Sequence, residues 1–189
     1  RGEESEGDEA FVREICRKLN VPLTVGEADV AEAAAAARRG VEETAREMRY
    51  AFLGETARAR GAGRIATAHN ARDNAETLLL HLVRGSGLRG LGGIPPRRGE
   101  IVRPLLEIDR EEILAWLAGR NIPFREDSSN KDERYARNYL RARVLPLLEE
   151  LNPRFVASCA RTARLLRSDE DCLRADMAAL NLGLHPVAA

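Results

Sequence analysis

Hydrophobic residues recur at helical intervals over most of the chain. Near the start they predict a helix that ends at Asn20 and Pro22. The segment from Ala31 to Arg60, rich in alanine, glutamate and arginine, predicts one long helix or two helices joined near Gly40. Three further helical stretches follow by the same spacing, at Asp73–Arg84, at Arg110–Gly119 with Asp109 as N-cap, and between Pro153 and Leu180.

Short apolar runs between these helices predict strands at Leu23–Val25, at Arg64–Ala68 and within IVRPLL at 101–106. The run LRGLGGIPPRRGE reads as a loop. Helices that alternate with strands in this way predict an α/β fold, an open parallel sheet flanked by helices. We expect residues 1–133 to form this α/β domain and residues 134–189 to form a helical extension toward a further domain.

Composition narrows the class of protein. The chain has 189 residues, with 30 Lys and Arg against 30 Asp and Glu, so net charge does not argue for a nucleic-acid partner. Its three cysteines form no CxxC pair and no metal spacing, which predicts no metal site and favours a reducing, cytoplasmic setting. No stretch approaches the roughly 20 apolar residues that a membrane span needs.

The candidate chemistry gathers in TAHNARDNAETLLLHLVRGSGLRGL, which begins at Thr67. His69 stands at the carboxyl end of a predicted strand, where open α/β sheets bind ligands. Asp73 and Glu76 lie three residues apart and share one face of the next helix. The structural alternative is equally weighted: acids at a helix start act as caps and complement the helix dipole.

Two basic or glycine-rich features suit phosphate groups. Gly85, Ser86 and Gly87 have the composition of a phosphate cradle, although glycine after a helix is first of all a C-cap, and the cap is favoured here. Arg137 and Arg141 form, with Arg134, a basic stripe at helical spacing. Acids nearby in the sequence, among them Glu149, offer the alternative of a neutralised, solvated face.

Five segments in order resemble the N-terminal catalytic domain of the tRNA(Ile)-lysidine synthetases, which belong to the PP-loop ATP pyrophosphatases. They are AREMRYAFL, ATAHNARDNAETLLLHLVRGSGLRGL, RPLL, REDSSN and RYARNYLRARVLPLLEELNP. The resemblance implies an adenine nucleotide alpha hydrolase-like fold. It also implies three substrates, which are ATP with Mg²⁺ as its companion ion, lysine, and an isoleucine tRNA with a CAU anticodon. It implies that the C2 oxygen of the first anticodon cytidine is adenylated and that the lysine ε-amine then displaces AMP. It is also compatible with a homodimer.

The resemblance assigns roles by motif position. Asp73 and Glu76 would hold the lysine ammonium, and Asp73 or His69 would accept a proton when the amine attacks. Arg49 and Arg141 would neutralise the triphosphate or the adenylate. Asn130 would line the same pocket, the glycine segment from Gly85 would border it, and Arg137 would help to bind substrate. An asparagine at position 73 is expected to remove lysine transfer and to leave tRNA affinity largely intact.

Two departures from the family pattern stand out. Arg72 occupies a position where many relatives carry an acid or an asparagine. The phosphate-gripping SGGxDS loop occurs nowhere in the chain. We therefore expect roughly 60 to 70 further residues to precede Arg1, from domain size and family layout. A chain that truly began at Arg1 is expected not to turn over ATP.

Two other functions compete with lysine transfer. A tRNA thiolation enzyme would need reactive cysteines near the nucleotide, whereas Cys16, Cys159 and Cys172 fall on predicted helices. A non-catalytic tRNA-binding module with an incomplete nucleotide site is supported by the missing loop. It has no need for His69, Asp73 and Glu76 together with the two arginines.

Overall fold

The computed structural model describes residues 3–125 and 135–180, and the chain within it divides into two compact units that meet between Ile65 and Ala66. Each unit is described by itself. The first contains α1 (Glu3–Lys18), α2 (Val30–Ala37) and α3 (Val41–Ala59). Strand β1 (Ile65–Ala66) spans the boundary. The second contains α4 (Ala71–Val83), α5 (Leu88–Leu91), β2 (Arg97–Arg98), β3 (Ile101–Val102), α6 (Arg110–Ala118), α7 (Ala136–Tyr139), the π-helix η2 (Leu140–Val144), α8 (Leu145–Leu151) and α9 (Phe155–Ala179).

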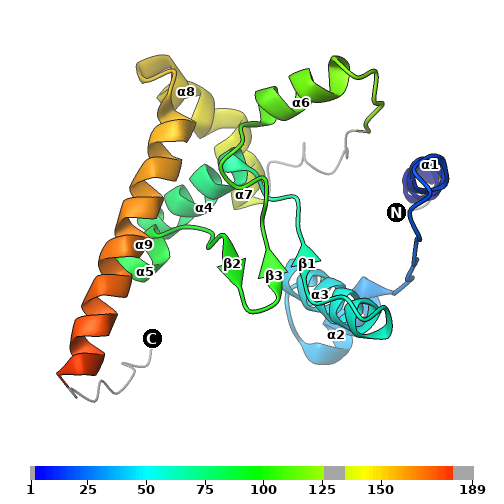
Figure 1. Cartoon of the computed structure of the whole chain (residues 1–189), viewed down its shortest axis with the longest axis horizontal. Helices are drawn as coiled ribbons and strands as arrows, with labels where there is room; N and C mark the ends of the chain where they lie inside the picture. Colours follow the sequence, from blue (N-terminus) through cyan, green and yellow to red (C-terminus); the bar gives the residue numbers. More distant parts are fainter. Residues whose placement is uncertain (1–2, 126–134, 181–189) are drawn as a thin grey trace. The chain divides into compact units, whose positions relative to one another are not determined.

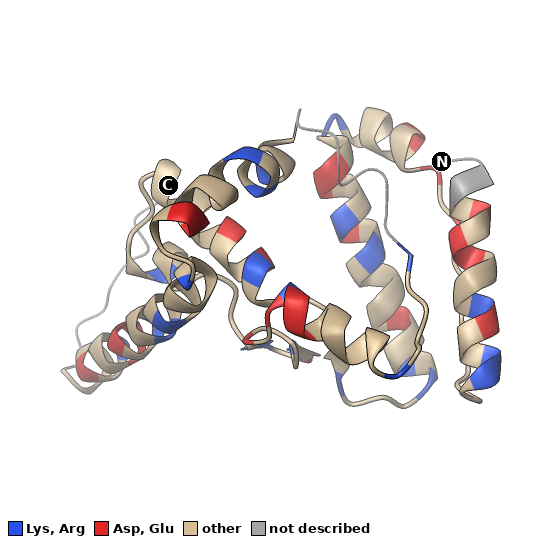
Figure 2. Cartoon of the chain, turned by 90° about the horizontal axis from the view of Figure 1, so that it is seen from above, with Lys and Arg blue, Asp and Glu red and all other residues tan. Residues whose placement is uncertain are grey.

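The first unit is helical. The segment 31–60 forms two helices rather than one, and they pack against each other. The Asp29 side chain starts α2 by accepting a hydrogen bond from the Glu32 amide at 2.9 Å, and Gly40 starts α3. Acidic and basic residues both occur along α1 and along α3, and neither helix is basic over its whole length (Figure 2). Neither helix therefore offers a continuous basic surface.

The expected strand at Leu23–Val25 is wrong, because this segment forms no strand. It lies instead against α3. Arg60 donates a hydrogen bond to Thr24 Oγ1 at 2.9 Å, and a Cβ at Gly26 would lie 2.7 Å from a ring carbon of Phe52. Leu23 is half-buried and Val25 is exposed, so the contacts of Thr24 and Gly26 with α3 place this segment without strand pairing.

The sheet is small and has the strand order β1-β3-β2. The Thr67 amide donates to Val102 O at 3.0 Å, and β2 pairs with β3 in antiparallel register, Arg97 opposite Val102. The segment expected to be a loop thus contains both α5 and β2. The two residues between β2 and β3 begin with Gly99 at φ +59°, and so tight a turn joins antiparallel strands only. This pair departs from the all-parallel sheet that the sequence predicts.

The core of the second unit lies where α4 meets the helices that follow residue 135. Ala71 and Ala75 on α4, Leu145 on α8, and Val156 and Cys159 on α9 are buried together. Small side chains on α4 allow α9 to approach closely, and α4 and α5 lie along this long helix in Figure 1. Burial also raises the pKa of Cys159 to about 11, so its thiol stays protonated and unreactive at neutral pH.

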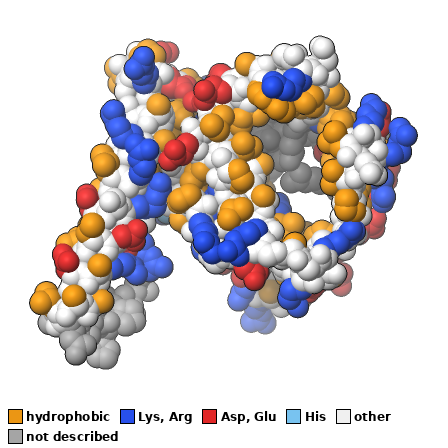
Figure 3. Space-filling model, in the orientation of Figure 1, with side chains coloured by type: hydrophobic (Ala, Val, Ile, Leu, Met, Phe, Trp, Pro, Cys, Tyr) orange, Lys and Arg blue, Asp and Glu red, His pale blue; other side chains and the backbone are white. Residues whose placement is uncertain are grey.

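The remaining length of α9 carries hydrophobic side chains at its surface (Figure 3). Leu165 and Leu173 on this helix are 57% and 50% exposed. Across residues 3–125 and 135–180, no helix combines the length and apolar character needed to cross a membrane.

Gly93 provides a test of the packing around α4. Its φ is +65°, and an added Cβ would collide with Oδ1 of Asn74, a buried side chain that accepts a hydrogen bond from the Ile94 amide at 2.8 Å. We expect Gly93→Ala to lower the free energy of unfolding by about 2–4 kcal/mol, since it adds left-handed strain to overpacking. Urea denaturation measures the effect. Gly87→Ala is the control, because nothing lies within 4 Å of a Cβ there and φ is −75°.

Candidate active site

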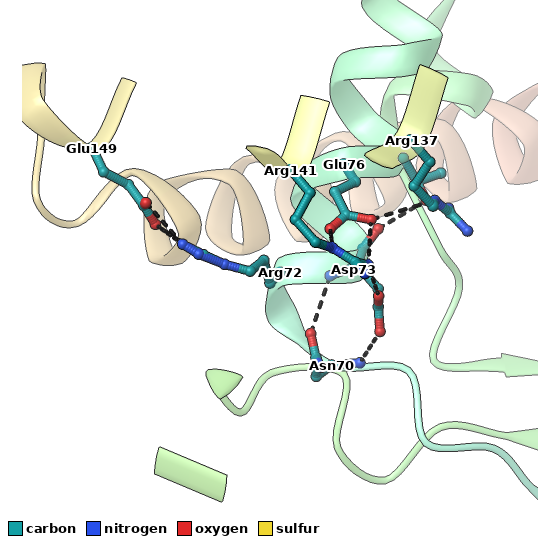
Figure 4. A network of polar contacts seen from close by, with 8 residues as sticks. Asn70, Arg72, Asp73, Glu76, Arg137, Arg141 and Glu149 are labelled. Atoms are coloured by element: carbon teal, nitrogen blue, oxygen red, sulfur yellow. Dashed lines mark hydrogen bonds and ion pairs between the residues drawn. The ribbon is translucent and has the colours of Figure 1, made fainter. Parts of the chain in front are cut away.

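The first turn of α4 is built by a reciprocal cap. The Asn70 side chain accepts a hydrogen bond from the Asp73 amide at 3.1 Å, and Asp73 Oδ2 accepts one from the Asn70 amide at 3.0 Å. The helix therefore starts at Ala71, two residues before the start that the sequence predicts. The structural alternative for Asp73 is confirmed in this respect, since one of its oxygens caps the helix. The other oxygen points away from the cap (Figure 4).

Glu76 lies one turn further along the same face of α4 and is fully buried. Arg141, on η2, meets both of its oxygens: Nε is 2.6 Å from Oε1 and Nη2 is 3.0 Å from Oε2. The same Nη2 is 3.3 Å from Asp73 Oδ1. One guanidinium thus joins the two acids that the sequence places on a common helix face.

Arg137, on α7, adds a second cation. Its Nε lies 3.4 Å from Glu76 Oε2, an ionic contact rather than a hydrogen bond, and its Nη2 donates to Thr77 Oγ1 at 2.5 Å. The Thr77 hydroxyl donates in turn to Asp73 O at 2.9 Å. In this arrangement Arg137 and Arg141 turn toward the carboxylates of α4, and the role of the basic stripe in phosphate binding stays a prediction.

Burial and charge act in opposite directions on this cluster. Burial raises the pKa of Glu76, and the hydrogen bond and charge of Arg141 offset that rise only in part. Burial alone would lower the pKa of Arg141, but the hydrogen bond to Glu76 and the charges of Glu76 and Asp73 raise it. A buried carboxylate costs free energy unless a cation compensates its charge, and Arg141 supplies that cation here.

A model of the PP-loop domain matches residues 2–148, which include α4, α7, η2 and most of the cluster's surroundings. The chain belongs to the PP-loop domain family. The resemblance drawn from five ordered motifs is confirmed at this level, and the family has an α/β fold.

Several curated relatives of this PP-loop domain have a named function. The chain is 46% identical over 170 residues to a tRNA(Ile)-lysidine synthase of Parabacteroides distasonis. This match covers 90% of the chain and 39% of the relative. It is 45% identical over 150 residues to the tRNA(Ile)-lysidine synthase of Chlorobaculum tepidum, a match that covers 79% of the chain and 45% of the relative. It is 42% identical over 151 residues to the tRNA(Ile)-lysidine synthase of Thermotoga maritima, a match that covers 80% of the chain and 36% of the relative. The chain thus spans 36 to 45% of the length of these three curated relatives.

The glycine segment of this PP-loop domain ends α4 with a Schellman cap. The Gly85 amide donates to Leu82 O at 3.0 Å, the Ser86 amide donates to His81 O at 3.0 Å, and Gly85 has φ +71°. The favoured interpretation as a C-cap is confirmed. Because these two amides are committed to the helix end, they do not face a phosphate in this arrangement.

The other candidate residues lie in different parts of the domain. His69 is in the segment between β1 and α4, and its Nδ1 is 3.0 Å from Thr67 Oγ1, so its role in proton transfer stays a prediction. Arg49 is on α3, in the first unit. Asn130 lies outside the described residues, as does the expected boundary between residues 133 and 134.

Sequence reasoning missed Asn74, and it noted Arg72 only as a departure from the family pattern, without its partner. Asn74, 2% exposed, holds the Ile94 amide, and Arg72 pairs with Glu149 on α8. No local pattern identifies a partner 77 residues away, although an arginine at the first turn of a helix, where acids are favoured, is a signal that it has a distant carboxylate partner.

Proposed function

We propose that this chain belongs to the catalytic part of an enzyme that joins lysine to the first anticodon cytidine of an isoleucine tRNA. In the proposed reaction, the cytidine C2 oxygen attacks the α-phosphorus of ATP and pyrophosphate leaves. The lysine ε-amine then attacks C2, and AMP leaves with the oxygen. Membership of the PP-loop domain family and similarity to tRNA(Ile)-lysidine synthases support this reaction.

The pair formed by buried Glu76 and half-buried Asp73 is the observation that carries the proposal. Burial raises the pKa of Glu76 in spite of the hydrogen bond from Arg141, and a second acid stands one turn away on the same face. Charge-assisted hydrogen bonds to such a pair suit a primary ammonium group, which has three donors on a compact charge. A lysine side chain presents that group.

Arg141 occupies the place that the lysine ammonium would take. Its guanidinium already contacts Glu76 and Asp73. Lysine that binds both acids must displace it, and the phosphates of ATP or of the adenylate are the anions to which it would turn. ATP is therefore expected to strengthen lysine binding, because it removes the resident cation from the acids.

The attacking amine must lose a proton, which sets a second task for the site. Carboxylates hold the charged amine and do not by themselves favour its neutral form. We assign the proton to Asp73 or to His69 at the moment of attack. Glu76 keeps the role of holding the amine, because it is fully buried.

ATP is the proposed energy source, with Mg²⁺ as its companion ion. The described stretches of the chain contain no group of three or more His, Cys, Asp or Glu side chains placed to hold a metal ion. They do not fit a magnesium site of the chain's own, and no step of the proposed reaction is assigned to the metal. The open parallel sheet and the division into residues 1–133 and 134–189 also remain proposals.

The test uses the complete natural polypeptide that contains residues 1–189. Radiolabelled lysine, ATP and an isoleucine tRNA with a CAU anticodon are incubated with it, and label in the tRNA is measured. We expect incorporation that requires ATP and releases one AMP for each lysine joined. A transcript with another first anticodon base is the control and should stay unlabelled. Failure of the CAU transcript to accept lysine would overturn the proposal.

A further inference from the structure

Arg72, directly before Asp73, makes a separate ionic contact between α4 and the helical run of residues 136–151. Its Nη2 lies 2.7 and 2.8 Å from the two carboxylate oxygens of Glu149, and its Nη1 lies 3.3 Å from Oε1 (Figure 4). The side chains are 16% and 28% exposed. A guanidinium that uses two nitrogens on one carboxylate fixes orientation as well as distance.

The helical run 136–151 is therefore tied to α4 at two places. Arg141 and Glu149 stand eight residues apart in the sequence, about 12 Å along a helix at 1.5 Å per residue. A helix held at one point can turn about that point, whereas a second, distant contact removes this freedom. The two contacts have opposite polarity, because α4 offers acids to Arg141 and a cation to Glu149. A run in the reversed orientation would bring like charges together.

The charges around Arg72 keep it cationic. Burial alone would lower its pKa, but the hydrogen bond and charge of Glu149, and then the charges of Glu111 and Asp109, raise it. The two latter acids belong to the start of α6, where burial and the neighbouring Glu111 raise the pKa of Asp109 to about 6. Assays at pH 8 keep both acids ionised, and Glu149→Gln, which leaves Arg72 and these acids in place, removes the contact with Glu149 alone.

We propose that Arg72 and Glu149 are positioning residues, whose ion pair holds the run 136–151 on α4 and so keeps the Arg141 guanidinium beside Glu76 and Asp73, from where it turns to phosphate when lysine binds the two acids. The pair acts through Arg141. As a determinant of catalysis it rests on the lysine transfer proposed above. It also explains the departure of this chain from its family, since the cation before Asp73 has a partner on α8.

The kinetic test is a set of variants in the complete polypeptide at pH 8. We expect Arg72→Gln and Glu149→Gln each to lower kcat/KM for lysine transfer about tenfold, since misplacement of a catalytic group slows the reaction steeply. The double variant should lose no more than either single one, and Arg72→Lys should recover part of the loss. In an Arg141→Lys background, Arg72→Gln should have little further effect. Arg174→Gln, which breaks an exposed pair with Glu170 on α9, is the control and should keep full activity.

A spectroscopic readout separates positioning from stability and from the proposed function. The Nε–H group of Arg141, which donates to Glu76, gives an NMR signal that Arg141→Lys removes and so identifies. We expect Arg72→Gln to shift this signal, and Arg174→Gln to leave it in place. An unchanged signal in Arg72→Gln would overturn the proposal. So would a loss of kcat/KM from Arg72→Gln that is equally large in the wild-type and the Arg141→Lys backgrounds. A wild-type protein without lysine transfer would overturn the proposed function, while the signal still decides the positioning.

Discussion

Asp73→Asn is expected to reduce lysine transfer by at least about 100-fold, the scale of a lost acid–base or charge-binding group. The substitution keeps an oxygen that can accept the Asn70 amide, so the start of α4 should survive. It removes the negative charge that faces Arg141 and that would hold the lysine ammonium. Incorporation of labelled lysine into the CAU tRNA measures the loss, and filter binding should show tRNA affinity largely intact.

The matched control for this variant is Asp29→Asn. Asp29 caps α2 by accepting the Glu32 amide, and asparagine caps helices equally well. The control therefore makes the same chemical change at another helix start and should keep activity. An Asp73→Asn enzyme with wild-type turnover would show that the carboxylate serves only the cap, and the assignment of Asp73 to the reaction would fall.

Arg141→Met is expected to lower the free energy of unfolding by about 2–4 kcal/mol at pH 8, because the buried charge loses its hydrogen-bonded partner and keeps only the ionic contact with Arg137. Glu76 is the charge in question, with no exposed surface. The double variant Glu76→Gln/Arg141→Met should recover most of the loss, because it leaves no ion uncompensated. Urea denaturation of the three proteins gives the comparison.

The pH dependence of this loss has a definite sign. The folded-state pKa of Glu76 is raised, so the folded protein holds the proton more tightly than the unfolded chain does. The associated stability is present below the ordinary glutamate pKa and is lost as pH rises through the higher folded value. Arg141→Met should therefore be much less harmful at pH 5 than at pH 8. Equal losses at both pH values would exclude Glu76 as the cause.

The sequence predicted the helices because helix caps and helical spacing involve residues that are close together in the chain. Asp109 and Glu112 build the cap of α6 at the expected place, and Asp73 and Glu76 share a face because helical spacing requires it. The start of α4 was placed two residues late, since an asparagine cap competes with an aspartate as a start signal. The strand at Leu23–Val25 failed for another reason: a strand needs a neighbour, and sequence alone does not supply one.

The site itself depended on long-range pairing that no local pattern contains. Arg141 meets Glu76 across 65 positions in the sequence, and spacing alone suggested that this arginine belonged to a phosphate-binding stripe. The family resemblance brought the same residues to one site but assigned Arg141 to phosphate. In the structure Arg141 pairs with Glu76, because a buried carboxylate is stabilised by a cation within reach, and its role toward phosphate stays a prediction.

The five π-helical residues of η2 make the length of the run 136–151 a constraint on its evolution. A π-helical turn holds more residues than an α-helical turn, and each residue of an α-helix turns the chain by about 100°. Loss of one residue between Leu140 and Val144 would rotate Glu149 relative to Arg137, and only one of them could still face α4. Substitutions in this stretch should therefore accumulate among related sequences more readily than insertions or deletions. A gap between residues 140 and 144 in an alignment would mark lineages that hold the arginine equivalent to Arg137 in some other way.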